Sequence, residues 1–257
     1  MTDGGNSSEG GRRDGKRPPP TPARKVRAAD LLRPAFRRSI WSTYDHIGLL
    51  VIANLLWLAL CIPVVTAPAS TAGLFRLARQ ISRREEASLR HFFEGFREHF
   101  VAALKLGIVD LAAVLVLWIN VDFYSHLRGG ATIPGMVLAA AMIWVAVFYW
   151  LMHVHLFALL VNGDSSLRQL LRKSALLTLD NLGFTFGIAF QSLALSALCV
   201  VTGAGLVLIN ASAVAVLLVS GHDEVRRRYH SWEPAPPDET RTLRDLWRPW
   251  ESGGPGK

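Results

Sequence analysis

The side chains best placed to do chemistry in this sequence are polar groups within long apolar stretches. Asp110 is the clearest of them, because it lies about two turns into a predicted membrane-spanning helix. Ionisable residues at such a depth are costly and often functional; for Asp110 we favour a structural hydrogen bond or ion pair inside the bundle, with a substrate or proton pathway as the alternative. Lys105 lies about 140° away around the same helix and is therefore a poor partner. We expect a candidate intramembrane polar site at Asp110 and Asn54, with Asn181 and Gln191 as alternative partners of Asp110.

Other reactive residue types do not combine into a catalytic pattern. His153 and His155 are two residues apart on a predicted helix, so they point about 200° apart and cannot converge on one metal ion. Cys61 and Cys199 lie in separate apolar stretches and form no CxxC pattern. The sequence contains no P-loop, HExxH or GxSxG motif. These observations predict a protein that is not an enzyme and that uses neither a metal nor a cofactor.

The elements that position these residues are apolar helices. Hydrophobic residues make up 51% of the 257 residues and charged residues 19%, below the share of about 25% in soluble proteins. Because about 20 mostly apolar residues let a helix cross the hydrocarbon core, we interpret four stretches as membrane-spanning, the last as two spans: 47–65, 106–121, 133–161 and 175–219. The predicted fold class is all-α: a polytopic helical membrane bundle with about five spans, a short returning hairpin leg and amphipathic interfacial helices.

The distribution of Lys and Arg predicts the topology. Of the 28 basic residues, ten precede residue 39, six lie in 67–100, three in 162–174 and seven after residue 225. Basic residues near span ends favour the cytoplasm. If the chain turns back around residues 66–71, all of these lie on one side, and Arg128 alone faces outward. We therefore expect a multi-pass protein of the plasma membrane with both termini in the cytoplasm, and we attribute the net charge of +8 to this pattern and not to nucleic-acid binding.

Composition divides the chain into three regions. Residues 1–30 are predicted to be a disordered basic tail, residues 31–225 a helical membrane domain, and residues 226–257 a cytoplasmic tail rich in Pro and Arg. Within the last apolar stretch, the motif VTGAG at 201–205 is the predicted break between spans.

A second basic segment, 83–100, predicts an amphipathic helix with Ser88 as its N-cap. Four aromatic rings fall on or near one helical face of this segment: Phe92, Phe93, Phe96 and Phe100. One interpretation is a helix that packs under the bundle or lies at the membrane interface. The other is a docking face for a second protein.

The stretch NLLWLALCIPVVTAPASTAGLFRLARQISRREEASLRHFFEGFREHF, residues 54–100, resembles the YesL-like family of bacterial multi-pass membrane proteins of unknown biochemical function. The likeness rests on an Asn-Leu-Leu-Trp start, a Pro-Val-Val-Thr turn, a small-residue stretch and a Phe-Phe-x-x-Phe helix. Beyond Phe100 it is mostly one of hydropathy, to about Ser220. The resemblance implies an association with carbohydrate uptake through sugar ABC transporters, and it supplies no catalytic residues.

Two functions are consistent with these observations. The first is an accessory or regulatory partner of carbohydrate uptake, which contacts a sugar transporter complex or a signalling membrane protein through its helices or the Phe-rich face. The second is a small self-sufficient transporter that uses an intramembrane polar site around Asp110, because interrupted helices mark such sites in transporters. Both place the protein in a lipid bilayer, and the oligomeric state remains open.

Overall fold

A computed structural model describes residues 28–126, 133–163 and 166–229 of the chain. Every element in this described part is helical, which confirms the all-α class. The predicted tails lie outside it, apart from short pieces at the first and last helices. The helices are α1 (Ala28–Asp45), α2 (Ile47–Cys61), the short 3₁₀-helix η1 (Val64–Thr66), α3 (Ala67–Arg83), α4 (Leu89–Glu98), α5 (Phe100–Ser125), α6 (Ile133–Val161), α7 (Leu167–Asp180), α8 (Leu182–Thr202), α9 (Ala204–Leu208) and α10 (Asn210–Tyr229).

The chain reverses direction between α2 and α3. Pro63 is extended and cannot continue α2, and η1 leads directly into α3. Two pairs across the bend show that the helices run antiparallel: Trp57 Nε1 donates to Thr71 Oγ1 at 3.1 Å, and the Cys61 and Ser70 side chains lie 3.4 Å apart. The returning leg is therefore present, and its bend lies at residues 62–66, slightly before the predicted position.

Helix α3 lies at the centre of the core and contacts α2, α4, α5 and α10. Its closest neighbour is α4, and two glycines allow this approach. A Cβ atom on Gly73 would lie 2.6 Å from the Phe92 carbonyl oxygen, and one on Gly95 would lie 3.1 Å from Gly73 Cα. The absence of side chains at both positions lets the two backbones nearly touch.

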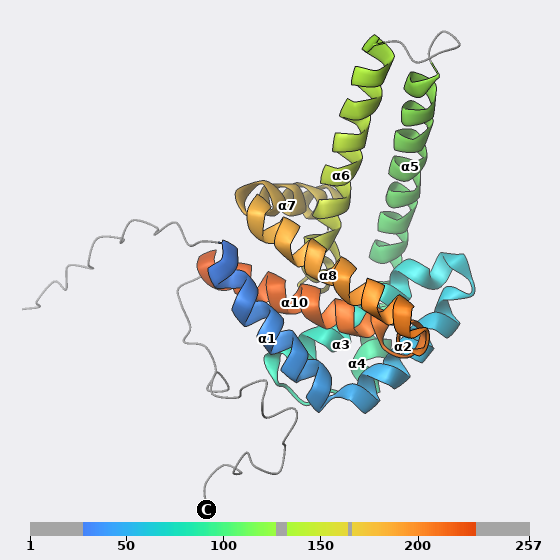
Figure 1. Cartoon of the computed structure of the whole chain (residues 1–257). Helices are drawn as coiled ribbons and strands as arrows, with labels where there is room; N and C mark the ends of the chain where they lie inside the picture. Colours follow the sequence, from blue (N-terminus) through green and yellow to red (C-terminus); the bar gives the residue numbers. More distant parts are fainter. Residues whose placement is uncertain (1–27, 127–132, 164–165, 230–257) are drawn as a thin grey trace, which may run out of the picture.

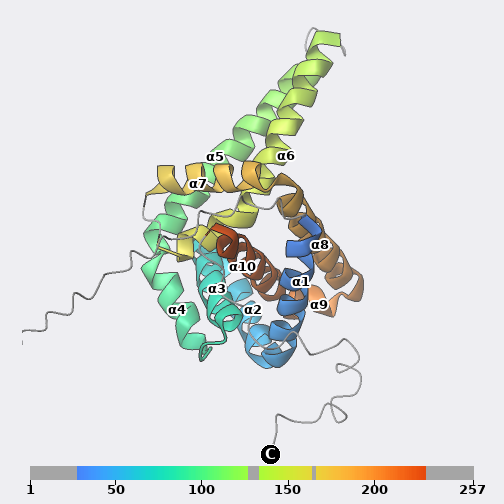
Figure 2. The same ribbon diagram turned by 90° about the vertical axis from the view of Figure 1, so that its left-hand side faces the viewer.

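Helices α5 and α6 form a long hairpin that projects away from the other helices (Figures 1 and 2). Most large apolar residues of α5 are exposed, as are those of α6 up to Trp150, whereas most of α6 from Leu151 onward is buried in the core. Helix α7 crosses the base of this hairpin in Figure 2. Exposed apolar surface of this length suits a lipid environment.

The number of long apolar helices is smaller than predicted. Within the described residues, three helices are long and apolar enough to cross a membrane: α5, α6 and α8. Residues 31–45 and α2 would make a fourth only as one bent unit, with an angle of 89° between them. The prediction of about five spans took the first three apolar runs as one helix each and divided the last run only once. In fact, α2 has 15 residues, about 22 Å, and is too short to cross alone.

The last apolar stretch is broken more than once. Asn181 separates α7 from α8, Gly203 ends α8 with a positive φ of 62°, and Ile209 separates α9 from α10. The predicted break at 201–205 is thus present, since glycine adopts that conformation without strain. The same breaks leave α8 as the one long apolar helix in the stretch where two spans were expected.

Candidate functional site

The most concentrated polar contact between the two long helices is centred on Asp110. The Tyr149 hydroxyl donates a hydrogen bond to Asp110 Oδ1 at 2.6 Å, and His153 Nε2 lies 3.1 Å from the same oxygen. Asp110 comes from α5, and its two partners come from α6. Asp110 and His153 keep 22% and 28% of their side-chain surface exposed, so the cluster is largely enclosed.

Helical spacing aligns the two partners of Asp110. Tyr149 and His153 are four residues apart and therefore share one face of α6. Their rings meet edge to face with centroids 4.9 Å apart, and His153 Nδ1 lies 2.9 Å from the Tyr149 carbonyl oxygen. None of the partners suggested by the sequence occupies this position. The i, i+4 pair of Tyr and His in an apolar helix was the available signal, but matching it to Asp110 required the register of the hairpin.

Asn54 has a different role and does not join this cluster. It is fully buried in α2, where its Nδ2 donates to the Val207 carbonyl at 2.6 Å and its Oδ1 accepts from the Ser212 amide at 3.1 Å. Both backbone groups flank the break between α9 and α10. The Asn54 side chain thus satisfies backbone groups that the interrupted helix leaves without helical partners.

The two neighbouring histidines of α6 point to different surroundings, as their spacing predicted. His153 contacts Asp110, whereas His155 is fully buried, with Nε2 3.0 Å from Thr185 Oγ1 of α8. The His155 ring lies near His222 of α10, with centroids 5.8 Å apart. Among the described residues, no three His, Cys, Asp or Glu side chains are grouped closely enough to hold a metal ion.

The four phenylalanines of the predicted docking face divide between the core and the surface. Phe92 is fully buried against α3, and Phe96 and Phe100 are partly buried with their rings 5.5 Å apart. Phe93 keeps 46% of its surface exposed. The docking interpretation therefore cannot include Phe92, which belongs to the core. Ser88 precedes the helix as predicted, and its backbone amide donates to His91 Nδ1 at 3.3 Å.

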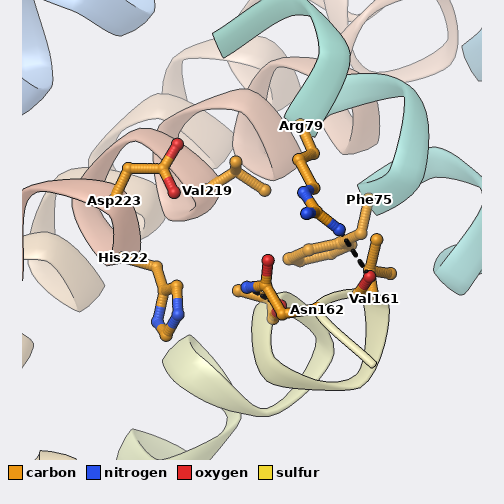
Figure 3. Close-up of a pocket in the computed structure, with 8 residues that line it drawn as sticks. Phe75, Arg79, Val161, Asn162, Val219, His222 and Asp223 are labelled. Atoms are coloured by element: carbon orange, nitrogen blue, oxygen red, sulfur yellow. Dashed lines mark hydrogen bonds between the residues drawn. The ribbon is translucent and has the colours of Figure 1, made fainter. Parts of the chain in front are cut away.

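A narrow crevice at the base of the hairpin collects further polar groups (Figure 3). Its empty volume is about 190 Å³, part of which is open solvent. Arg79 of α3 donates to the Val161 carbonyl at 2.7 Å, at the C-terminal end of α6, where a cation is favoured by the helix dipole. Asp223 of α10 accepts from Ser82 at 3.1 Å. Burial lowers the pKa of Arg79 from its ordinary value, and nearby arginines add to this shift, whereas Asp223 opposes it.

These groups make the crevice a packing contact between α3, α6 and α10. Asn162 Oδ1 accepts from Arg226 at 3.2 Å, which adds a link from the end of α6 to α10. The charges in the crevice are thus engaged with the chain itself.

A family described as "Protein of unknown function, DUF624" matches residues 50–121, which run from α2 to near the end of α5. The match overlaps the stretch that resembles the YesL-like family, and the chain is similar to this family over that part of its length. The matched residues contain the α2–α3 turn, the α3–α4 contact and Asp110. No curated protein and no solved structure matches the chain.

Proposed function

We propose that this chain is an integral membrane protein without chemistry of its own, which acts as an accessory or regulatory partner of ABC-type carbohydrate uptake. The carbohydrate context comes from the resemblance of residues 54–100 to the YesL-like family, and the family of unknown function that matches residues 50–121 overlaps that stretch. The observation that carries the mechanism is the junction of α4 and α5. His99 alone separates the two helices and is buried, so that the surface helix α4 is rigidly attached to the base of a long apolar helix.

The surface of α4 is the proposed contact with the partner. The helix is held on α3 by the Gly73–Gly95 approach, and its outer side presents Phe93 beside the ion pair of Arg90 Nε with Glu94 Oε1 at 2.7 Å. Aromatic and arginine side chains are enriched at the energetic centres of protein interfaces. A partner that binds Phe93 would therefore act directly on the base of α5.

The proposed location is the bacterial plasma membrane with the hairpin base in the cytoplasm. Because α4 precedes α5 and α7 follows α6, the basic residues of α4 and α7 attach at the base and not at the tip. This arrangement agrees with the preference of Lys and Arg for the cytoplasmic side. The ten basic residues before residue 39 and the seven after residue 225 favour the cytoplasm for both termini as well.

Cysteine labelling tests this orientation in a variant that lacks Cys61 and Cys199. Ser88 is exposed before α4, and Ser125 ends α5 at the opposite end of the hairpin. In intact cells, an impermeant thiol reagent should label Ser125→Cys but not Ser88→Cys. Labelling of Ser88→Cys would contradict the proposed orientation. Ser231→Cys in the C-terminal tail should also stay unlabelled if that terminus is cytoplasmic, and this position lies outside the described residues.

Photo-crosslinking tests the partner. A crosslinking amino acid at Phe93 should capture a subunit of a carbohydrate uptake complex in native membranes. The matched control is the same amino acid at Arg172, an exposed position on α7 at the same end of the hairpin. Capture of lipid alone at Phe93, or equal capture of the subunit at both positions, would contradict the docking proposal.

The Asp110 cluster favours a second candidate, a self-sufficient transporter. A carboxylate held by Tyr149 and His153 between two apolar helices is the kind of group that lines ion pathways. Asn54 does not support this candidate, because it is engaged with the backbone of the α9–α10 break. Sugar uptake by the purified protein in liposomes, lost in Asp110→Asn, would replace the accessory role with this one.

A further inference from the structure

If Asp110 is an ionised carboxylate and His153 a neutral imidazole, the contact between them lacks a donor hydrogen. His153 Nδ1 lies 2.9 Å from the Tyr149 carbonyl oxygen, which can only accept, so Nδ1 carries a hydrogen. In the neutral imidazole, Nε2 is then an acceptor. It lies 3.1 Å from Asp110 Oδ1, which is also an acceptor when the carboxyl group is ionised.

A hydrogen bond at this distance requires one more proton. Either His153 carries it as an imidazolium that donates to the carboxylate, or Asp110 carries it as an acid that donates to Nε2. We propose that Asp110 and His153 form a binding site for one proton inside the α5–α6 hairpin, with the Tyr149 hydroxyl as the second donor to the carboxyl group.

The apolar surroundings favour this protonated pair. Both of its forms have no net charge, whereas loss of the proton would leave a carboxylate between two apolar helices. The same loss would leave two acceptor atoms, His153 Nε2 and Asp110 Oδ1, 3.1 Å apart with no hydrogen bond between them. Tyr149 would then be the remaining donor to Asp110 within the described residues.

Neighbouring charges do not replace the proton. Within the part of the chain that the structure describes, Asp110, Tyr149 and His153 form no hydrogen bond or ion pair with charged groups outside α5 and α6. Lys105 of α5 is exposed and lies more than one helical turn from Asp110, toward the base of the hairpin. The titratable and charged groups on the elements packed against α5 and α6 include Arg76, Arg79 and Arg83 on α3, Arg90, His91, Glu94, Arg97 and Glu98 on α4, Arg168, Arg172, Lys173 and Asp180 on α7, and His222, Asp223, Glu224 and Arg226 on α10.

Binding of the proton and closure of the α5–α6 hairpin are thermodynamically linked. The two contacts of Asp110 are the side-chain hydrogen bonds that join α5 to α6 in the described residues. A proton that binds the closed arrangement more tightly than the open one stabilises closure by the same amount. Raising the pH should therefore loosen the hairpin.

The experiment uses the full chain in lipid nanodiscs, with Cys61 and Cys199 replaced and spin labels at Val114 and Val145. These exposed positions lie one turn beyond Asp110 and Tyr149 toward the hairpin tip. Nitrogen-15 spectra of His153 and the infrared carboxyl band of Asp110 report where the proton is. At neutral pH we expect either an imidazolium beside an ionised carboxylate or a neutral imidazole beside a protonated carboxyl group. On raising the pH, that proton should be lost and the distance between the labels should lengthen or broaden.

Two variants separate the proton from the bond. In Asp110→Asn the amide can donate to Nε2 without a titratable proton, so the label distance should stay short and independent of pH. Tyr149→Phe removes the phenol and keeps the proton pair, so the pH dependence should remain. An ionised Asp110 beside a neutral His153 in the closed hairpin would overturn the proposal. The same pH dependence in Asp110→Asn as in the natural sequence would also overturn it. The accessory role is tested separately at Phe93 and does not depend on either result.

Discussion

Helix α3 is buried in the core and helix α5 is largely exposed, whereas hydropathy alone would predict the opposite. Helix α3 carries Arg76, Arg79 and Arg83 and is the less apolar of the two, yet it lies at the centre of the core with most of its residues buried. Helix α5 is long and strongly apolar, yet only 11% of its most apolar 18-residue stretch is buried inside the chain. Apolar content therefore indicates which helix can face lipid. Small residues and an amphipathic pattern indicate which helix is enclosed by others.

The polar contacts of the two regions differ in the same sense. In the core, Asn54 holds backbone groups on both sides of a helix break. In the hairpin, Asp110 joins side chains of two otherwise regular helices. Loss of the first contact leaves backbone groups without partners, whereas loss of the second leaves both helices intact. We therefore expect substitutions in the core to cost more than substitutions in the hairpin.

The largest effect is expected for Phe92→Ala. Phe92 is fully buried between α4 and α3, so its truncation should lower the free energy of unfolding by about 3–5 kcal/mol. Unfolding of the purified protein by SDS in mixed micelles measures this. Phe93→Ala is the matched control and should cost only about 1 kcal/mol, because Phe93 is already about half exposed. Equal losses at the two positions would show that α4 does not pack as described.

The next effect is expected for Asn54→Ala. The Val207 carbonyl and the Ser212 amide would each lose a partner, at about 1–3 kcal/mol for each buried group. Limited proteolysis should also cut more rapidly near the α9–α10 break. Asn120→Ala removes a comparable amide whose bond to the Val116 carbonyl stays within α5, and it should leave both measurements nearly unchanged. An unchanged cleavage rate in Asn54→Ala would argue against this role.

Substitution of two helical glycines compares the close contact with open space. In Gly73→Ala the added carbon meets the Phe92 carbonyl oxygen at 2.6 Å, so we expect a loss of about 1–3 kcal/mol. In Gly48→Ala nothing lies within 4 Å of the new carbon, and the change should be neutral or stabilising by up to about 1 kcal/mol. The same unfolding assay measures both. Only Gly73→Ala should be destabilising, and a neutral Gly73→Ala would contradict the α3–α4 packing.

A smaller effect is expected for Tyr149→Phe in the hairpin. It removes one hydrogen bond between α5 and α6, which in membranes contributes about 0.6–2 kcal/mol. Tyr124→Phe near the hairpin tip is the control, because no hydrogen bond of its hydroxyl is among those of the described residues. A loss in Tyr149→Phe as large as that in Phe92→Ala would remove the contrast between hairpin and core.

The smallest effect concerns acid sensitivity at the α4–α5 junction. Burial lowers the pKa of His99 from its ordinary value of 6.5, and within the described residues Nε2 has no hydrogen-bond partner. Because the unfolded chain then binds the proton more readily, stability should fall as the pH drops below 6.5 and should be unaffected above it. Thermal unfolding at pH 7.5 and pH 5 should show a smaller acid loss in His99→Gln. An acid loss in His99→Gln equal to that of the natural sequence would contradict this role of His99.

The prediction from sequence succeeded where the cause was local. Ser88 before an amphipathic run, Pro63 after an apolar run and Gly203 between two runs mark helix ends through their own backbone chemistry. The helical class follows from runs of apolar residues that are too long for strands. The described residues contain three helices, or four with the bent pair, that are long and apolar enough to cross, where about five spans were predicted, because hydropathy measures an apolar run and does not measure where a helix within it ends.

The candidate site was found only in part for a related reason. Asp110 is conspicuous in the sequence, because a carboxylate in an apolar run is rare. Its partners Tyr149 and His153 come from another helix, and Asn54 was grouped with it although its own contacts lie at residues 207 and 212. Spacing within one helix cannot reveal such pairs.

The sequence by itself determined the helical class, the apolar character of the long helices, the turn after α2 and the amphipathic face of α4, because each depends on neighbours along the chain. The tertiary structure alone decided that Phe92 is buried while Phe93 is exposed, and that Asp110 meets His153. Those outcomes depend on the register between helices, which is set where Gly73 and Gly95 allow close backbone contact and where the α5–α6 hairpin closes. Register is a property of packed surfaces, and no single segment contains it.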